Sequence, residues 1–392
     1  MTESRSRRVT QQDIARMTGV SQATVSLVLN GRAETDVRIA PQTRARVLDA
    51  IRSTGYVADP IARRLAARRN RILGVFTYEP VFPVGTGDFY HPFLVGIEEG
   101  AESLGCDLLL LTSAPVVDGR RRIFHEDNRL RLADGCVLLG RSLDRDELAR
   151  LVAEGQPFVS VGRRDDAGGP VPYVGADYPA ATAAIVERAV AAGHRTLAYV
   201  GQGDQPVGPA PQTGLDGQDR PAAPESHADR ERGFRAAVAA AGVTGIHEPV
   251  EDRSPAELLD SLLARGVTVA LMEEYADGSA IAAAARERGL DIPRDLSLAA
   301  LGDPTRPAPS DVDFTMFRIP RRQMGWQAVE VLTRLLEGTP GPETGEARSD
   351  GGQRRDRTGA DAHDDTGRGR QHPPQILLDC EQVEGTTLAL PR

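Results

Sequence analysis

From residue 71 onward, short apolar runs alternate with longer amphipathic stretches, and this alternation restricts the fold more than any other feature of the chain. Each run, from ILGVFTY at 72–78 to LSLAALG at 296–302, has the length of a strand that is buried on both faces. The stretches between the runs, such as DRDELARLVAEG, carry apolar residues at helical spacing. Strand and helix repeated in this order predict an α/β fold with parallel sheets. The number of repeats favours two doubly wound subdomains over one sheet.

Residues 10–70 follow a different pattern and predict an all-α segment. Four helical stretches, separated by turn signals, read QQDIARMTG, SQATVSLVLNG, PQTRARVLDAIRSTG and DPIARRLAAR. Residues 1–71 hold 14 Arg against 6 Asp or Glu, a net charge of +8, whereas the remainder holds 33 Arg against 50 Asp or Glu, a net charge of −17. A basic module attached to an acidic body suggests contact with nucleic acid. The absence of Lys suits phosphate contacts, but genomic base composition explains it equally well.

Two segments interrupt the alternation. Residues 202–228 and 339–374 are rich in Gly, Pro, Asp and Arg and poor in apolar residues. Such segments cannot bury enough apolar surface to offset the entropy cost of ordering. We therefore expect both to be disordered surface insertions, either without a role or in contact with partners.

Several classes of protein are disfavoured by what the sequence lacks. Cys106, Cys136 and Cys380 are odd in number and widely spaced, which is typical of buried thiols in a reducing cytoplasm. The sequence has no run of about 18 apolar residues that could form a membrane span. It also has no apolar segment after the first charges that could form a signal peptide. The glycines of VGQGDQPVG are followed by Pro and not by a helix, which disfavours a dinucleotide site. We expect a cytoplasmic protein that is not an enzyme and binds no cofactor or metal.

The segment DIARMTGVSQATVSLVLNG is the most specific local pattern. Ala15 is small where two helices would cross, Gly19 suits a left-handed residue after the first helix, and Val25 would anchor the second helix. Ser21 is placed to cap the second helix, so that its first residues can enter a major groove. The alternative is an ordinary helical hairpin, but the capping Ser and the local basic charge favour DNA binding.

Several segments resemble the lactose-repressor/galactose-repressor (LacI/GalR) family of bacterial transcriptional regulators. They include VTQQDIARMTGVSQATVSLVLNG, RARVLDAIRSTGYVADPIARRLAAR, VERAVAAGHRTLAYVG, ADRERGFRAAV, RERGLDIPRDLSLAALGD and ILLDCEQVEGTT. The resemblance implies a helix-turn-helix headpiece over 8–58, a hinge helix over 59–70, and a two-lobed core like the periplasmic binding proteins over 71–392. It also implies a homodimeric repressor that binds a palindromic double-stranded DNA operator and responds to a small-molecule effector in the cleft between the lobes.

The resemblance assigns DNA contacts residue by residue. Gln22, Ala23 and Leu27 match positions that face base edges, and Leu27 departs from the polar residue that many members carry there. The resemblance assigns a second group of residues to phosphate contacts or to fixing the turn: Thr10, Ser21, Thr24, Ser26 and Asn30. In the hinge, Leu65 matches the residue that wedges between base pairs of the minor groove, with Arg63 beside it. The alternative is a flexible basic linker with Leu65 packed on the core.

The resemblance also assigns effector contacts. Phe234 matches a position where members place an aromatic ring against the ligand, and Arg163 and Arg230 match polar positions of the cleft. An aromatic cluster after the first strand is either a pocket wall or a patch of core, and it consists of Tyr78, Phe89, Tyr90 and Phe93.

Several residues that bind sugar hydroxyls in the family are replaced. Gly162 stands where many members have Asp, Glu274 begins the pair that replaces a common Asn-Asp, and Gly302 replaces the first of two Asp. Glu274 and the retained Asp303 stay as candidates for the effector site. The effector is therefore a sugar, a different metabolite, or absent from a degenerate pocket. A solute-binding protein without a DNA function is the alternative for the whole chain.

Overall fold

The computed structural model divides the chain into two compact units, Met1–Asn70 and Arg71–Arg392. Each unit has its own hydrophobic core. The described residues are 9–29, 39–54, 56, 70–79, 89–117, 120–125, 129–141, 143–164, 169–202, 212–213, 219–220, 224–250, 253–304, 312–338 and 372–391.

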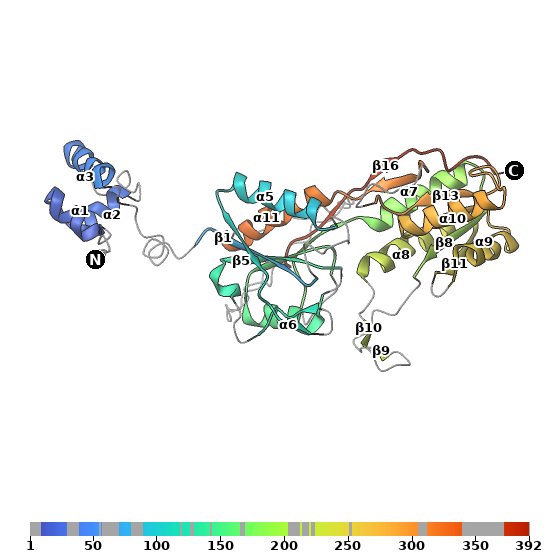
Figure 1. Cartoon of the computed structure of the whole chain (residues 1–392), viewed down its shortest axis with the longest axis horizontal. Helices are drawn as coiled ribbons and strands as arrows, with labels where there is room; N and C mark the ends of the chain where they lie inside the picture. The colour runs from blue at the N-terminus through green and yellow to red at the C-terminus, as the bar shows by residue number, and fades with distance from the viewer. Residues whose placement is uncertain are drawn as a thin grey trace, which may run out of the picture. The chain divides into compact units, whose positions relative to one another are not determined.

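The N-terminal unit contains three short helices, α1 (Gln11–Thr18), α2 (Gln22–Leu29) and α3 (Pro41–Thr54) (Figure 1). Ile14, Val25 and Val47 are fully buried at their centre. The chain turns after α1 at Gly19, whose φ of 65° is a left-handed conformation that favours Gly. These helices confirm the predicted helix-turn-helix headpiece. The predicted fourth helix, DPIARRLAAR, lies outside the described residues.

The first lobe of the larger unit is a six-stranded parallel sheet. Its order is β15 (Gln375–Leu378), β7 (Tyr173–Ala176), β6 (Phe158–Val161), β5 (Gly135–Leu139), β1 (Ile72–Thr77) and β2 (Asp107–Leu111). One face is covered by α5 (His91–Ser103) and α11 (Arg321–Glu337). The other face is covered by α6 (Arg145–Glu154) and the short 3-10 helix η2 (Leu130–Leu132), as Figure 1 shows for α6.

The second lobe repeats this arrangement. Its sheet has the order β11 (Thr244–Pro249), β8 (Thr196–Gly201), β12 (Val269–Met272), β13 (Ser297–Ala300), β14 (Thr315–Arg318) and β16 (Glu381–Val383). Only the pairing of β14 with β16 is antiparallel in this sheet. Helices α7 (Tyr178–Ala191) and α8 (Glu225–Ala241) cover one face, and α9 (Pro255–Ala264) and α10 (Tyr275–Glu287) cover the other. The predicted two doubly wound subdomains are confirmed.

The chain passes between the lobes three times, after β7, after β14 and after β15. The second passage, after β14, is why α11 and β15 belong to the first lobe although they follow the second lobe in sequence. Two glycines allow α11 to lie against α5: a Cβ on Gly96 would fall 1.8 Å from the carbonyl oxygen of Arg322, and one on Gly325 would fall 2.2 Å from that of Phe93. No side chain fits at either position, so these glycines fix the close contact of the two helices.

Two short antiparallel pairs complete the described elements: β3 (Val116–Val117) with β4 (Arg120–Arg121), and β9 (Gln212–Thr213) with β10 (Asp219–Arg220). The second pair lies within the predicted insertion 202–228. Helix α8 also begins inside that range, at Glu225, because Pro224 precedes a helical sequence there. The disorder expected over 202–228 therefore does not extend to its last residues. Most of the second insertion, 339–371, lies outside the described residues. In the part of the chain that is described, no helix is long and apolar enough to span a membrane.

Candidate functional site

The start of α2 is held by side-chain hydrogen bonds. Ser21 Oγ accepts from the Thr24 amide at 3.1 Å and lies 2.9 Å from the Thr24 hydroxyl, so it caps the helix as predicted. Thr10 caps α1 in the same way, because its Oγ accepts from the Asp13 amide and its hydroxyl and amide both donate to the Asp13 carboxylate. The Ser21 hydroxyl thus fixes the start of α2 after the turn, and the Thr10 hydroxyl fixes the start of α1.

One side of α2 faces away from the core of the headpiece. Gln22 and Ala23 are exposed, and Ser26 and Leu27 are half-buried, whereas Val25 and Val28 are buried. The predicted base-contacting residues therefore share an accessible side of the helix. Gln22 Nε2 also donates to Gln11 Oε1 at 3.4 Å, a partner on α1 that sequence reasoning missed. Three predicted contacts, Asn30, Arg63 and Leu65, lie outside the described residues.

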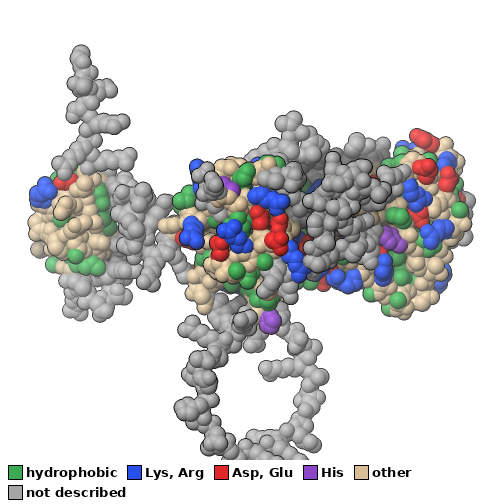
Figure 2. Space-filling model, turned by 90° about the horizontal axis from the view of Figure 1, so that it is seen from below, with side chains coloured by type: hydrophobic (Ala, Val, Ile, Leu, Met, Phe, Trp, Pro, Cys, Tyr) green, Lys and Arg blue, Asp and Glu red, His purple; other side chains and the backbone are tan. Residues whose placement is uncertain are grey.

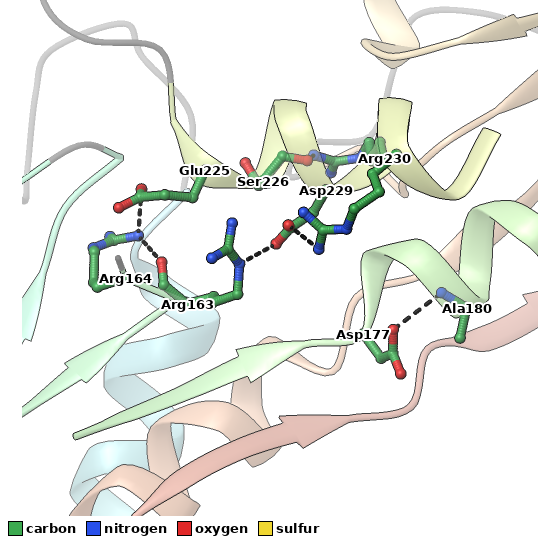
Figure 3. Close-up of polar contacts among 9 residues, drawn as sticks. Arg163, Arg164, Asp177, Ala180, Glu225, Ser226, Asp229 and Arg230 are labelled. Atoms are coloured by element: carbon green, nitrogen blue, oxygen red, sulfur yellow. Dashed lines mark hydrogen bonds and ion pairs between the residues drawn. The ribbon is translucent and has the colours of Figure 1, made fainter. Parts of the chain in front are cut away.

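Two arginines after β6 join the first lobe to the start of α8 (Figure 3). Arg163 Nε donates to Asp229 Oδ2 at 2.8 Å, and Arg164 Nη1 donates to Glu225 Oε2 at 3.2 Å. Arg164 is anchored in its own lobe, because Nη2 also donates to the carbonyl oxygen of Gly140 at 2.6 Å. Asp229 and the Arg164 side chain are almost fully buried. These ion pairs bind one lobe to the other at the carboxyl ends of the strands.

Gly162 explains how Arg164 reaches this place. Its φ of 97° is left-handed, and a Cβ there would fall 3.0–3.4 Å from three atoms of the Arg164 guanidinium. The space that an Asp at this position would use is therefore filled by the Arg164 side chain. The sequence shows the missing Asp but not its replacement.

Arg230 and Phe234 both lie on α8, but they have different surroundings. Arg230 Nε donates to the carbonyl oxygen of Leu301 at 2.7 Å, and its guanidinium lies 4.0 Å from the centre of the Tyr178 ring. Phe234 is 2% exposed and packs in the core, with its ring 5.7 Å from that of Tyr199. The structure thus contradicts the expectation that Phe234 offers a ring to a ligand, because α8 turns this side chain onto the sheet.

The predicted aromatic cluster divides in two. Tyr78 is 1% exposed and packs edge-on against Phe76 beneath α6, so it belongs to the core, which was the alternative reading. Phe89, Tyr90 and Phe93 pack together at the start of α5 on the other face. The Tyr90 hydroxyl donates to Glu79, and the Arg141 guanidinium lies 4.8 Å from the centre of the Phe89 ring.

Glu274 and Asp303 follow neighbouring strands of the second lobe. Glu274 is exposed and precedes α10 without capping it by a side-chain hydrogen bond. Asp303 Oδ1 accepts from Arg321 Nη1 at 2.7 Å and from the Ile319 amide at 2.9 Å. The Asp303 carboxylate therefore fixes the passage from β14 into α11.

A buried polar cluster that sequence reasoning missed lies beside these residues. Glu273 follows β12 directly and is 4% exposed; its Oε2 accepts from the Gln202 amide at 2.8 Å. Its Oε1 lies 3.0 Å from His227 Nδ1 on α8, but neither atom makes a hydrogen bond of acceptable geometry. Burial raises the pKa of Glu273 and lowers that of His227 to about 4. The sequence signal that could have identified Glu273 is its position directly after the apolar run VTVALM.

The surface charge of the larger unit and the absence of a metal-binding cluster among the described residues are two further features of the protein. On the face of the larger unit in Figure 2, arginines and carboxylates lie interspersed, so this face carries no field of one sign. Within the described ranges, no group of three or more His, Cys, Asp or Glu side chains could hold a metal ion.

Two family models match the chain. Residues 10–59 match the bacterial regulatory proteins of the lacI family, and residues 186–350 match a periplasmic binding protein-like domain. Catabolite control protein A of Priestia megaterium is 25% identical over 342 residues, which cover 84% of this chain and 92% of that protein. The HTH-type transcriptional regulator CelR of Thermobifida fusca is 29% identical over 351 residues, which cover 85% of this chain and 94% of that protein.

Solved structures show the same fold. The lac repressor dimer bound to operator and the anti-inducer ONPF superposes with a TM-score of 0.63 at 18% identity, covering 98% of this chain and 100% of that chain. The CelR–cellobiose complex gives a TM-score of 0.52 at 22% identity, covering 97% and 100%. Three findings point to the same family: the match of the headpiece, the match of the periplasmic-binding-protein-like unit, and the relatives that match along most of their length. The chain belongs to the LacI/GalR family of bacterial transcriptional regulators.

Proposed function

We propose that this protein is a transcriptional repressor that binds a palindromic operator as a homodimer and is controlled by a small-molecule effector between its lobes. Its relatives are regulators, which supports a regulatory role in the cytoplasm without catalysis. The observation that carries the proposal is the capped helix α2, which exposes Gln22 and Ala23 while Val25 is buried. A helix exposed at its first residues fits the major groove.

Each DNA contact has a stated role. Gln22 reads adenine through its amide, and Leu27 contacts a thymine methyl group beside Ala23. The polar group that contacts phosphates and steadies the turn comprises Thr10, Ser21, Thr24, Ser26 and Asn30. Leu65 wedges into the minor groove at the centre of the operator, and Arg63 binds the neighbouring phosphates. A two-fold symmetric dimer makes the operator palindromic, and the lac repressor solved on its operator is a dimer.

The effector binds where the carboxyl ends of both sheets face each other. Arg163 and Arg230, with Glu274 and Asp303 from the second lobe, provide polar groups there, and the aromatic wall consists of Phe89, Tyr90 and Phe93. An effector that changes the distance between the lobes must break or strengthen the pairs Arg163–Asp229 and Arg164–Glu225. The state of these pairs thereby links effector binding to the geometry of the DNA-binding segments. CelR, solved with cellobiose, supports a sugar or a related metabolite as the ligand class.

Selection of bound DNA from a random duplex pool tests the proposal. Full-length protein should enrich a palindrome, and repeating the selection with metabolites should identify a compound that changes retention. Gln22→Ala should alter the enriched half-site, whereas Gln323→Ala, an exposed glutamine in the first turn of α11, should not. Enrichment of no sequence, or the same half-site from Gln22→Ala, would contradict the proposal.

A further inference from the structure

Three buried polar atoms in the second lobe make no hydrogen bond of acceptable geometry, although the Tyr199 hydroxyl lies close enough to the Glu273 carboxylate to shift its pKa. They are the Tyr199 hydroxyl oxygen on β8, His227 Nδ1 on α8 and Glu273 Oε1 directly after β12. Tyr199 is 1% exposed and Glu273 is 4% exposed. Polar atoms left unsatisfied at such depth are costly, and they mark a place where a ligand group can supply the missing contacts.

The chain makes room for the Glu273 carboxylate. A Cβ on Gly201 would fall 2.2 Å from Glu273 Oε2 and 2.7 Å from Tyr199 Cε1, so only glycine leaves this space open. The amide of Gln202 fixes Oε2 at 2.8 Å. One carboxylate oxygen is therefore held by the backbone, and the other lies 3.0 Å from His227 Nδ1.

The charges around this carboxylate do not cancel. Glu274 and Asp277, at the start of α10, add to the negative charge of Glu273, and the charges of both glutamates act on Asp277. The positive charges that act on the cluster are those of Arg230 and, from the other lobe, Arg141. Arg163 and Arg164 are already paired with Asp229 and Glu225. Glu231 also acts on Glu273, but it is paired with Arg235. The other three carboxylates face two guanidinium groups, so the cluster is one positive charge short.

We propose that the effector carries a protonated primary amine, which binds Glu273 Oε1 together with the Tyr199 hydroxyl and His227 Nδ1. An ammonium group has three donors and no acceptor, and it supplies the missing positive charge. His227 is neutral at pH 7, and with its proton on Nε2 it accepts at Nδ1. Because Nδ1 and Oε1 lie 3.0 Å apart, one nitrogen can contact both. A ligand hydroxyl has only one donor and brings no charge. This inference rests on the proposed function.

The test compares amines with their hydroxyl counterparts on the full-length protein. Isothermal titration calorimetry at pH 7 would use D-glucosamine against D-glucose, ethanolamine against ethylene glycol, and 1,4-diaminobutane against 1,4-butanediol. We expect at least one amine to bind, and its hydroxyl counterpart should have an affinity lower by about tenfold or more. The reason is that charge-assisted hydrogen bonds are stronger than neutral ones. Binding of no amine, or equal binding within each pair, overturns the inference.

Variants place the amine at the cluster. Glu273→Gln keeps an oxygen for the Gln202 amide but loses the charge, so it should abolish the preference for the amine. Glu287→Gln, on the exposed end of α10, should leave the preference unchanged. If Glu273→Gln does not fold, Tyr199→Phe replaces it in the test and should lower the affinity for the amine severalfold. An unchanged preference in the folded cluster variant contradicts the inference.

Titration of the selected operator duplex with the same protein separates the two proposals. Failure to bind any duplex overturns the proposed function. Duplex binding without an amine preference overturns only the amine site.

Discussion

Removing the Arg163 side chain should open the cleft between the lobes. Asp229 is almost fully buried, and it accepts from Arg163 at 2.8 Å and from Arg232 at 2.5 Å. A buried charge left without any partner costs about 3–5 kcal/mol. Arg163→Ala leaves Arg232 in place, and the Arg163 side chain is 20% exposed, so we expect a smaller cost of about 1–2 kcal/mol. That free energy shifts the ratio of closed to open molecules by roughly 5- to 30-fold.

Small-angle X-ray scattering without ligand measures this shift, because opening raises the radius of gyration. Arg188→Ala is the matched control, since it removes the ion pair with Glu384 inside the second lobe and should not change the scattering. A double-mutant cycle with Asp229→Asn should give a coupling energy of about 1 kcal/mol or more. Equal scattering by Arg163→Ala and the wild type, or additive effects in the cycle, would refute the role of the Arg163–Asp229 ion pair in holding the lobes together.

The remaining predictions concern both units. Ser21→Ala removes the acceptor for the Thr24 amide and should cost the headpiece about 1 kcal/mol, seen as a lower melting temperature of that unit alone; an unchanged value would show that the cap is not formed. Gly325→Ala puts a Cβ 2.2 Å from the Phe93 carbonyl oxygen, and overpacking of about 1–3 kcal/mol should lower the urea midpoint, whereas a higher midpoint would contradict the α5–α11 contact. Burial lowers the pKa of His227 to about 4 from 6.5, so its contribution to stability is complete above about pH 6.5 and is lost as pH falls toward 4. His227→Gln should flatten this part of the urea-measured pH profile, and parallel profiles would argue that the histidine is exposed.

The local patterns of the sequence predicted the elements well. The spacing of apolar residues shows which face of a single helix or strand is buried. The caps at Thr10 and Ser21 are also local, because each joins residues three positions apart. The sequence did not predict that α11 and β15 belong to the first lobe, because the order of elements along the chain does not say where a chain crosses back. The contact between α5 and α11 needs Gly96 and Gly325, two residues that are far apart in sequence.

The candidate site was predicted less completely, for a related reason. Spacing places Phe234 on α8 but does not say which side of α8 meets the sheet, and the structure buries its ring. Arg164 fills the space left at Gly162, a substitution between neighbours that a position-by-position match does not reveal. Glu273 escaped notice because its role depends on Gly201 and Tyr199, which come from another strand.

The most direct test of the account is whether Gln22 reads adenine in the operator. Fluorescence anisotropy would measure the affinity of wild type and Gln22→Ala for the selected duplex and for duplexes with each base pair of one half-site changed in turn. Wild-type protein should discriminate against loss of one A·T pair by about 1–3 kcal/mol, and Gln22→Ala should lose that discrimination while keeping it at the other positions. Equal discrimination by both proteins at every position would contradict the account, because α2 would then not be the element that reads the DNA.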